Sequence, residues 1–186
     1  MAKKLQIATL LAISIILPSQ ADARSVKAVD LSNGNGSFKV KNKYVQIFNR
    51  CIAEAEEAYN QNNPKQSYYN CIGLATQECE RSEPDEGKIG YFCYDLEDML
   101  WTNLAQKYYE LLREDAKDRE DTDGSKPLTL LDDAAKLWLK TFETDCDFAS
   151  ARWGFGTESY EDSHRCYRDG MASRAIQYLK WYNQAH

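Results

Sequence analysis

The sequence lacks the patterns that mark most metal and nucleotide sites. It has no Cys-x-x-Cys pair, no His-Glu-x-x-His motif and no phosphate-binding glycine loop, and its only histidines are His164 and His186. Zinc sites need cysteine and histidine ligands at short spacings, so we expect no metal and no cofactor. No segment alternates apolar and polar residues with period two, so we expect no sheet.

Long hydrophobic runs are also missing. Residues 5–17 are the most apolar stretch, and they are too few to span a bilayer, which takes about 20 residues. Two lysines precede this stretch and Ala21-Asp22-Ala23 follows it. This pattern predicts a signal peptide over residues 1–23 and a mature protein that is periplasmic or secreted, without a stable membrane anchor.

Basic residues are fewer than acidic residues, 23 against 29. The formal net charge is −6, and removal of residues 1–23 takes away two lysines and one aspartate, which leaves −7. Such a balance argues against nucleic acid and against anionic membranes as partners. It suits a basic protein partner, although acidity also simply keeps proteins soluble.

Helical periodicity dominates the rest of the chain. Residues 24–41 are polar, contain Asn33-Gly34-Asn35-Gly36 and predict a flexible lead-in. Beyond them, apolar residues recur every three or four positions. They predict an all-α fold of about five helices in antiparallel hairpins, near residues 44–59, 65–80, 87–118, 127–151 and 159–182. Ser82 is the expected N-cap of the third helix, and the charged residues 115–125 are an expected mobile connection.

The six cysteines all lie beyond the predicted signal peptide. In an oxidising compartment they predict three disulfides, chosen from fifteen pairings. Partners across a helical hairpin should be nearly symmetric about its turn. Pairs of consecutive cysteines centre on residues 61, 86 and 156, each beside an expected turn, and the alternative Cys51–Cys79 with Cys71–Cys93 centres less well. The symmetry predicts Cys51–Cys71, Cys79–Cys93 and Cys146–Cys166.

The best candidate for partner contact is the loop Trp153-Gly154-Phe155-Gly156. It places two aromatic residues on a stretch fixed by the Cys146–Cys166 bridge, and aromatic residues in anchored loops often serve as interface anchors. The alternative, that one or both rings fold back onto the core, stays open at this point.

Other singled-out residues have structural interpretations. Trp101 and Trp138 fall on apolar stripes, which predicts core positions. Arg174 lies close to the buried face of the last helix and should need a carboxylate, for which Glu143 or Asp145 of the facing helix is the candidate. We expect this contact to clamp the hairpin. His164 is interpreted as a polar loop histidine, because its sequence neighbours Asp162 and Ser163 cannot form a triad with it.

Residues 79–182 resemble the LprI-like lysozyme-inhibitor family of exported bacterial proteins. The most specific part is a tryptophan eight residues before a cysteine, a glycine-rich loop, and a cysteine eight residues before an arginine. The matching positions are Cys79, Ser82, Cys93, Leu104, Tyr108, Trp138, Cys146, Gly154, Gly156, Cys166 and Arg174. The resemblance implies a helical family domain over residues 79–186, with residues 42–78 as an added helical hairpin.

Three positions depart from the family pattern. The family tends to have Asp, Asn and Arg where this chain has Trp101, Ala105 and Phe142, which puts shared binding chemistry in doubt. With no catalytic constellation apparent, the protein is interpreted as a non-enzymatic binding protein. The resemblance implies inhibition of a basic lysozyme or another peptidoglycan hydrolase. The alternatives are an immunity protein against a secreted toxin, a non-inhibitory envelope accessory protein and, last, an undetected hydrolase.

Overall fold

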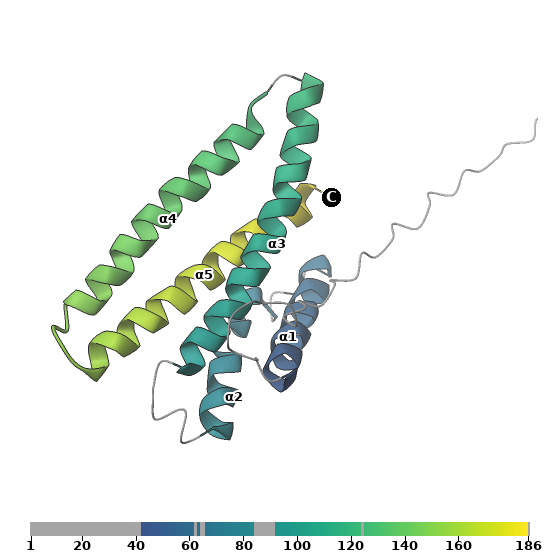
Figure 1. The fold of residues 1–186 in the computed structure, drawn as a ribbon. Coiled ribbons are helices and arrows are strands. Elements are labelled where there is room, and N and C mark those ends of the chain that lie inside the picture. Colours follow the sequence, from purple (N-terminus) through teal and green to yellow (C-terminus); the bar gives the residue numbers. More distant parts are fainter. Residues whose placement is uncertain (1–41, 62, 64–65, 84–91, 124, 186) are drawn as a thin grey trace, which may run out of the picture.

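The computed structural model describes residues 42–185, except 62, 64–65, 84–91 and 124 (Figure 1). The predicted signal peptide and lead-in lie outside the described residues. The elements are α1 (Asn42–Asn60), the 3-10 helix η1 (Tyr68–Cys71), α2 (Leu74–Ser82), α3 (Phe92–Asp123), α4 (Pro127–Ala151) and α5 (Thr157–Ala185). The predicted all-α fold with five α-helices and antiparallel hairpins is confirmed.

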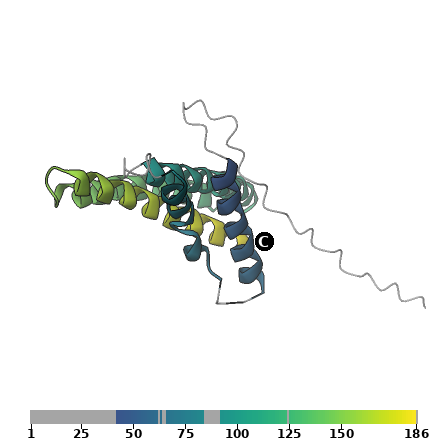
Figure 2. The ribbon, with the colours of Figure 1, turned by 90° about the horizontal axis from the view of Figure 1, so that it is seen from below.

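The long helix α3 occupies the middle of the molecule. It packs against α5 most extensively and also contacts α2 and α4, while α1 contacts η1 and α2. Seen from below, the turn between α4 and α5 lies at the end of the molecule away from α1 (Figure 2). The turn end of the α4–α5 hairpin therefore lies away from α1, while α5 itself packs along α3.

One hydrophobic core joins α1, η1, α2, α3 and α5. Trp101 of α3 is fully buried at its centre, as predicted, and meets the ring of Phe48 edge-on at 4.7 Å between centroids. Tyr108 is buried too and contacts the ring of Tyr182 at 5.7 Å. Because the core includes residues from both predicted segments, 42–78 and 79–186, the two share one packed interior.

All three predicted disulfides are present: Cys51–Cys71, Cys79–Cys93 and Cys146–Cys166. They join α1 to η1, α2 to α3, and α4 to α5, so each staples neighbouring elements. Six cysteines in three bridges indicate an oxidising, extracytoplasmic environment. Within the described residues, no helix is sufficiently long and apolar to cross a membrane.

The predicted single helix over residues 65–80 is wrong, because Gly73 divides it into η1 and α2. Gly73 has φ +90°, a left-handed conformation that glycine adopts easily. Ser82 is the last residue of α2, not the N-cap of α3, and its hydroxyl donates to Glu78 Oε1 at 2.7 Å. The predicted start of α3 near residue 87 lies outside the described residues.

The N-terminus of α2 is capped from another helix. Glu97 of α3 is fully buried, and its carboxylate accepts hydrogen bonds from the backbone N–H of Gly73 at 2.6 Å and of Thr76 at 2.7 Å. It also accepts from the Thr76 hydroxyl at 2.8 Å and the Trp101 indole at 3.0 Å. Gly73 has no side chain to cap the helix, so Glu97 satisfies its first N–H groups and complements its dipole.

The charged residues 115–123 continue α3, so the predicted mobile connection over this stretch is wrong. The stretch contains neither glycine nor proline, and its Lys, Arg, Glu and Ala residues have good helix propensity. Ala116 is buried within it, which ties the last part of α3 to its neighbours.

Helix α4 covers one side of α3 and α5, and its own outer face stays exposed. Leu130 and Leu137 are each 69% exposed on that outer face. On the inner face Phe142 is buried, but Trp138 is only half-buried, so the predicted core position of Trp138 is not confirmed. Trp138 stacks on Phe142 with ring centroids 4.7 Å apart. The Arg174 guanidinium of α5 lies over the Trp138 ring, 5.1 Å from its centroid, and part of the ring lines two hollows beside α5.

We predict that Gly170→Ala destabilises the protein, although alanine normally favours a helix over glycine. A Cβ atom at Gly170 would lie 2.1 Å from the Phe142 ring, which packs directly on the α5 backbone. Overpacking of this kind should cost about 1–2 kcal/mol in a urea titration. In a Phe142→Leu background the clash is relieved, so the same substitution should become neutral or stabilising there. A stabilising effect in the original background would contradict the packing of Phe142 on Gly170.

Candidate binding site at the hairpin tip

The turn between α4 and α5 is held rigidly. Gly154 and Gly156 have φ +73° and +143°, conformations that allow the chain to reverse within a few residues. The Ser150 and Ser159 hydroxyls lie 2.8 Å apart, and the Ser159 hydroxyl also donates to the Ser150 carbonyl at 3.0 Å. With the Cys146–Cys166 bridge below them, these contacts fix the two helix ends that carry the turn.

Four aromatic side chains are exposed around this turn, which we call the tip. Phe155 is fully exposed, and Phe148, Tyr160 and Trp153 are 70%, 64% and 54% exposed. The predicted contact residues Trp153 and Phe155 therefore face outward and do not fold back onto the core. The sequence pattern did not single out Phe148 and Tyr160 as contact residues. The signal for Phe148 was its place on the helix face opposite Phe142 and Cys146.

Trp153 is oriented by a polar contact. Its indole N–H donates to Asp162 Oδ2 at 2.6 Å, and Arg152 pairs with the same carboxylate. The Arg152 guanidinium also lies over the Trp153 ring, 5.5 Å from its centroid. Hydrogen bonds from Arg152 and Trp153 hold the pKa of Asp162 below its usual range. A side chain held in this way loses less conformational entropy when a partner covers it.

The tip is strongly acidic. Residues 143–162 contain six carboxylates and a single cation, Arg152. The carboxylates are Glu143, Asp145, Asp147, Glu158, Glu161 and Asp162. Exposed aromatic rings amid negative charge match a basic surface on a partner, because the rings supply contact area and the carboxylates supply steering.

Arg174 forms no ion pair with Glu143 or Asp145, so the predicted carboxylate partner is wrong. It is buried in α5, where its Nη1 donates to Gln177 Oε1 at 2.9 Å. Its guanidinium lies over the rings of Trp138 and Tyr178, 5.1 Å and 4.4 Å from their centroids. Aromatic ring faces contact the Arg174 guanidinium where a carboxylate was expected. The sequence pattern could not distinguish between these two kinds of partner.

His164 lies in α5 and not in a loop, which corrects the earlier interpretation. Its Nδ1 is paired with Asp95 of α3 across the helix interface. Next to this pair, Asp98 is half-buried, and its Oδ1 has no hydrogen-bond partner among the described residues. Burial and the nearby Asp95 charge raise the pKa of Asp98 to about 6, while His164 opposes the shift. This cluster of charges therefore makes the stability of the folded protein depend on pH.

Within the part of the chain that the structure describes, no three or more His, Cys, Asp or Glu residues are grouped so that they could hold a metal ion. Comparisons of the chain with protein-family models, with curated proteins and with solved structures found no match. The resemblance to the LprI-like family therefore stays a prediction.

Proposed function

We propose that this protein is a periplasmic or secreted binding protein that inhibits a lysozyme or a related peptidoglycan hydrolase. The observation that carries the proposal is the tip, where exposed aromatic rings and carboxylates project on a disulfide-stapled hairpin. The choice of a lysozyme-type target rests on the family resemblance. The protein acts by binding in this proposal and needs neither metal nor cofactor.

The shape and charge of the tip support this kind of target. Binding grooves of enzymes are concave, and a narrow hairpin end can enter them where a flat surface cannot. Carboxylates around the tip attract a basic enzyme and raise the association rate at low salt. Binding should therefore be stoichiometric, independent of metal, and weaker as salt screens charges beyond about 8 Å at 0.15 M.

The double variant Trp153→Ala/Phe155→Ala should weaken binding to the target by about 2 kcal/mol or more, close to 30-fold in Kd, because the rings are the contact anchors. Titration calorimetry against the inhibited enzyme measures the loss. The matched control is Leu130→Ala/Leu137→Ala, which removes two apolar side chains, each 69% exposed, from the outer face of α4. The control should bind normally, and both variants should keep the far-UV circular dichroism of the original.

A turbidity assay of bacterial lysis, with excess mature protein, decides on the target. Inhibition of at least one lysozyme type supports the proposal. Unchanged lysis across several lysozyme types removes it and leaves a toxin-specific immunity protein or an envelope accessory protein as the better account.

A further inference from the structure

Arg174 carries a buried positive charge that has no counter-ion among the described residues. The residue is 6% exposed, and its one hydrogen bond to a described residue goes to the neutral amide of Gln177. Its Nε and Nη2 atoms are buried and have no acceptor among the described residues. Leaving buried donors of a charged group unsatisfied is costly, so the arrangement calls for a further acceptor.

The surrounding aromatic rings stabilise the charge of Arg174 but do not supply the missing hydrogen-bond acceptors. Tyr178, Trp138 and Trp181 have their centroids 4.4, 5.1 and 5.8 Å from the Arg174 guanidinium carbon. Ring faces stabilise the cation from above and below its plane. The N–H groups of a guanidinium point outward within its plane, however, so they still need oxygen atoms at the edge.

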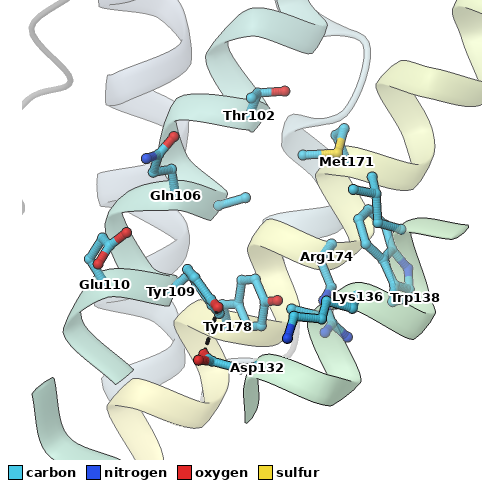
Figure 3. A pocket seen from close by; sticks show the side chains of 13 residues that line it. Thr102, Gln106, Tyr109, Glu110, Asp132, Lys136, Trp138, Met171, Arg174 and Tyr178 are labelled. Carbon is cyan, nitrogen blue, oxygen red and sulfur yellow. Dashed lines mark hydrogen bonds between the residues drawn. The ribbon is translucent and has the colours of Figure 1, made fainter. Parts of the chain in front are cut away.

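On one side of Arg174, the carboxylate of Asp132 is already paired with other groups. Arg174 forms part of a hollow of about 380 Å³ between α3, α4 and α5. Figure 3 shows its guanidinium between Trp138 and Tyr178, with Asp132 turned toward Tyr109. Asp132 accepts from the Tyr109 hydroxyl at 2.7 Å and from Arg113 Nε at 3.2 Å. This acid therefore neutralises Arg113 and not Arg174.

The other side of Arg174 opens on a second hollow of about 360 Å³. None of the described residues that line it is acidic, although the chain carries a net charge of −6. Lys180 adds a second cation to its wall, and Ser173, Gln177 and Gln184 add neutral polar groups. Gln177 is exposed, so its side chain can move out of the hollow.

We propose that this second hollow binds the carboxylate of a small organic ligand. The carboxylate displaces the Gln177 amide and, after a small rotation of the guanidinium, accepts two parallel hydrogen bonds from Arg174. Lys180 contributes long-range attraction, and Trp138 and Trp181 cover an apolar part of the ligand. A hollow of this size suits a molecule as large as a capped amino acid.

The site is separate from the tip and does not rest on the proposed function. Arg174 lies 18 residues along α5 from Gly156, which is roughly 27 Å of helix. A carboxylate of this kind can come from a free small acid or from the C-terminus of a peptide. The recognition chemistry is the same for both, and the probes below distinguish them.

The first experiment uses N-acetyl-L-phenylalanine and its amide, a pair that differs in the negative charge. The mature protein is titrated with each while the Arg174 Nε–Hε signal is followed by NMR. The acid should shift this signal and bind at least 10-fold more tightly than the amide. Ala-Ala-Phe with a free or an amidated C-terminus tests in the same way whether the carboxylate comes from a peptide. If Ala-Ala-Phe with a free C-terminus binds more tightly than N-acetyl-L-phenylalanine, the ligand is a peptide C-terminus. An equal affinity of acid and amide, or no shift with any probe, overturns the proposal.

The second experiment places a carboxylate at the site from within the chain. Gln177→Glu puts an acid where the Gln177 oxygen already meets Arg174, so it should abolish binding of the acid probe and raise Tm by about 3 °C. The matched control is Gln184→Glu, which adds the same charge to the same hollow from a residue not bonded to Arg174. The control should leave Tm unchanged and weaken binding no more than threefold. The proposal is overturned if the Gln177→Glu variant binds the acid probe as tightly as the original protein does. It is also overturned if Gln177→Glu and Gln184→Glu weaken binding of the acid probe equally.

Discussion

Replacing Glu97 with alanine is expected to destabilise the protein by about 3–5 kcal/mol, since several buried donors lose their acceptor at once. The substitution leaves the N–H groups of Gly73 and Thr76, the Thr76 hydroxyl and the Trp101 indole without the carboxylate that they share. It also removes the negative charge that faces the N-terminus of α2. Urea unfolding followed by circular dichroism measures the loss.

Two controls separate the hydrogen bonds from the volume of the side chain. Glu97→Gln keeps the shape of the side chain but places an NH2 group against N–H and O–H donors that need an acceptor. It should therefore still lower the free energy of unfolding by about 1–3 kcal/mol. Glu78→Ala removes a carboxylate from the surface of α2, where its contacts with Arg81 and Ser82 are solvent-exposed or only partly buried. That change should cost under about 1 kcal/mol. A loss below this value for Glu97→Ala would contradict the role of Glu97 as the cap of α2.

Replacing Asp98, which follows Glu97 in the sequence, with asparagine is expected to stabilise the protein. Burial and Asp95 raise the pKa of Asp98 to about 6 from a usual value of 3.8. The folded state therefore binds a proton more tightly than the unfolded state, and ionisation of Asp98 disfavours folding. A shift of about two units corresponds to about 2–3 kcal/mol, which Asp98→Asn should recover at pH 7.

The pH dependence provides the control. At pH 3.5 and below, Asp98 is mostly protonated in both states, so the variant and the original protein should be nearly equally stable. As pH rises from about 4 to 6, the original protein should lose stability relative to Asp98→Asn. Urea titrations at pH 3.5, 5 and 7 follow the difference. Asp95→Asn should reduce it, because the Asp95 charge is part of the cause. A constant difference across these pH values would show that the pKa of Asp98 is not raised.

Local features of the fold could be predicted from the sequence. The disulfides follow from cysteine spacing because each bond lies within a hairpin, where the turn sets which residues face each other. Helix periodicity placed α1, α4 and α5 within a few residues of their bounds. It failed at Gly73, where a left-handed residue divides the second segment, and at residues 115–123, where charge was taken as a sign of an irregular connection.

Features that depend on how helices meet could not be predicted. Glu97 falls on the buried stripe that holds Cys93, Leu100 and Leu104, and an acid on an apolar stripe was the available signal. Its partners on α2 depend on how α2 and α3 pack, which the spacing does not reveal. Likewise, the tip could be named from Trp153 and Phe155, but the part that Asp162 has in orienting Trp153 follows from the closed hairpin.

The order of the disulfides along the chain has a consequence for how the protein matures. The first cysteine of the chain is bonded to the second, the third to the fourth and the fifth to the sixth, at sequence separations of 14 or 20. A chain that is translocated from its N-terminus therefore presents each pair before the following pair emerges. An oxidant that joins cysteines in order of appearance produces the native set directly, so maturation requires no disulfide isomerisation step.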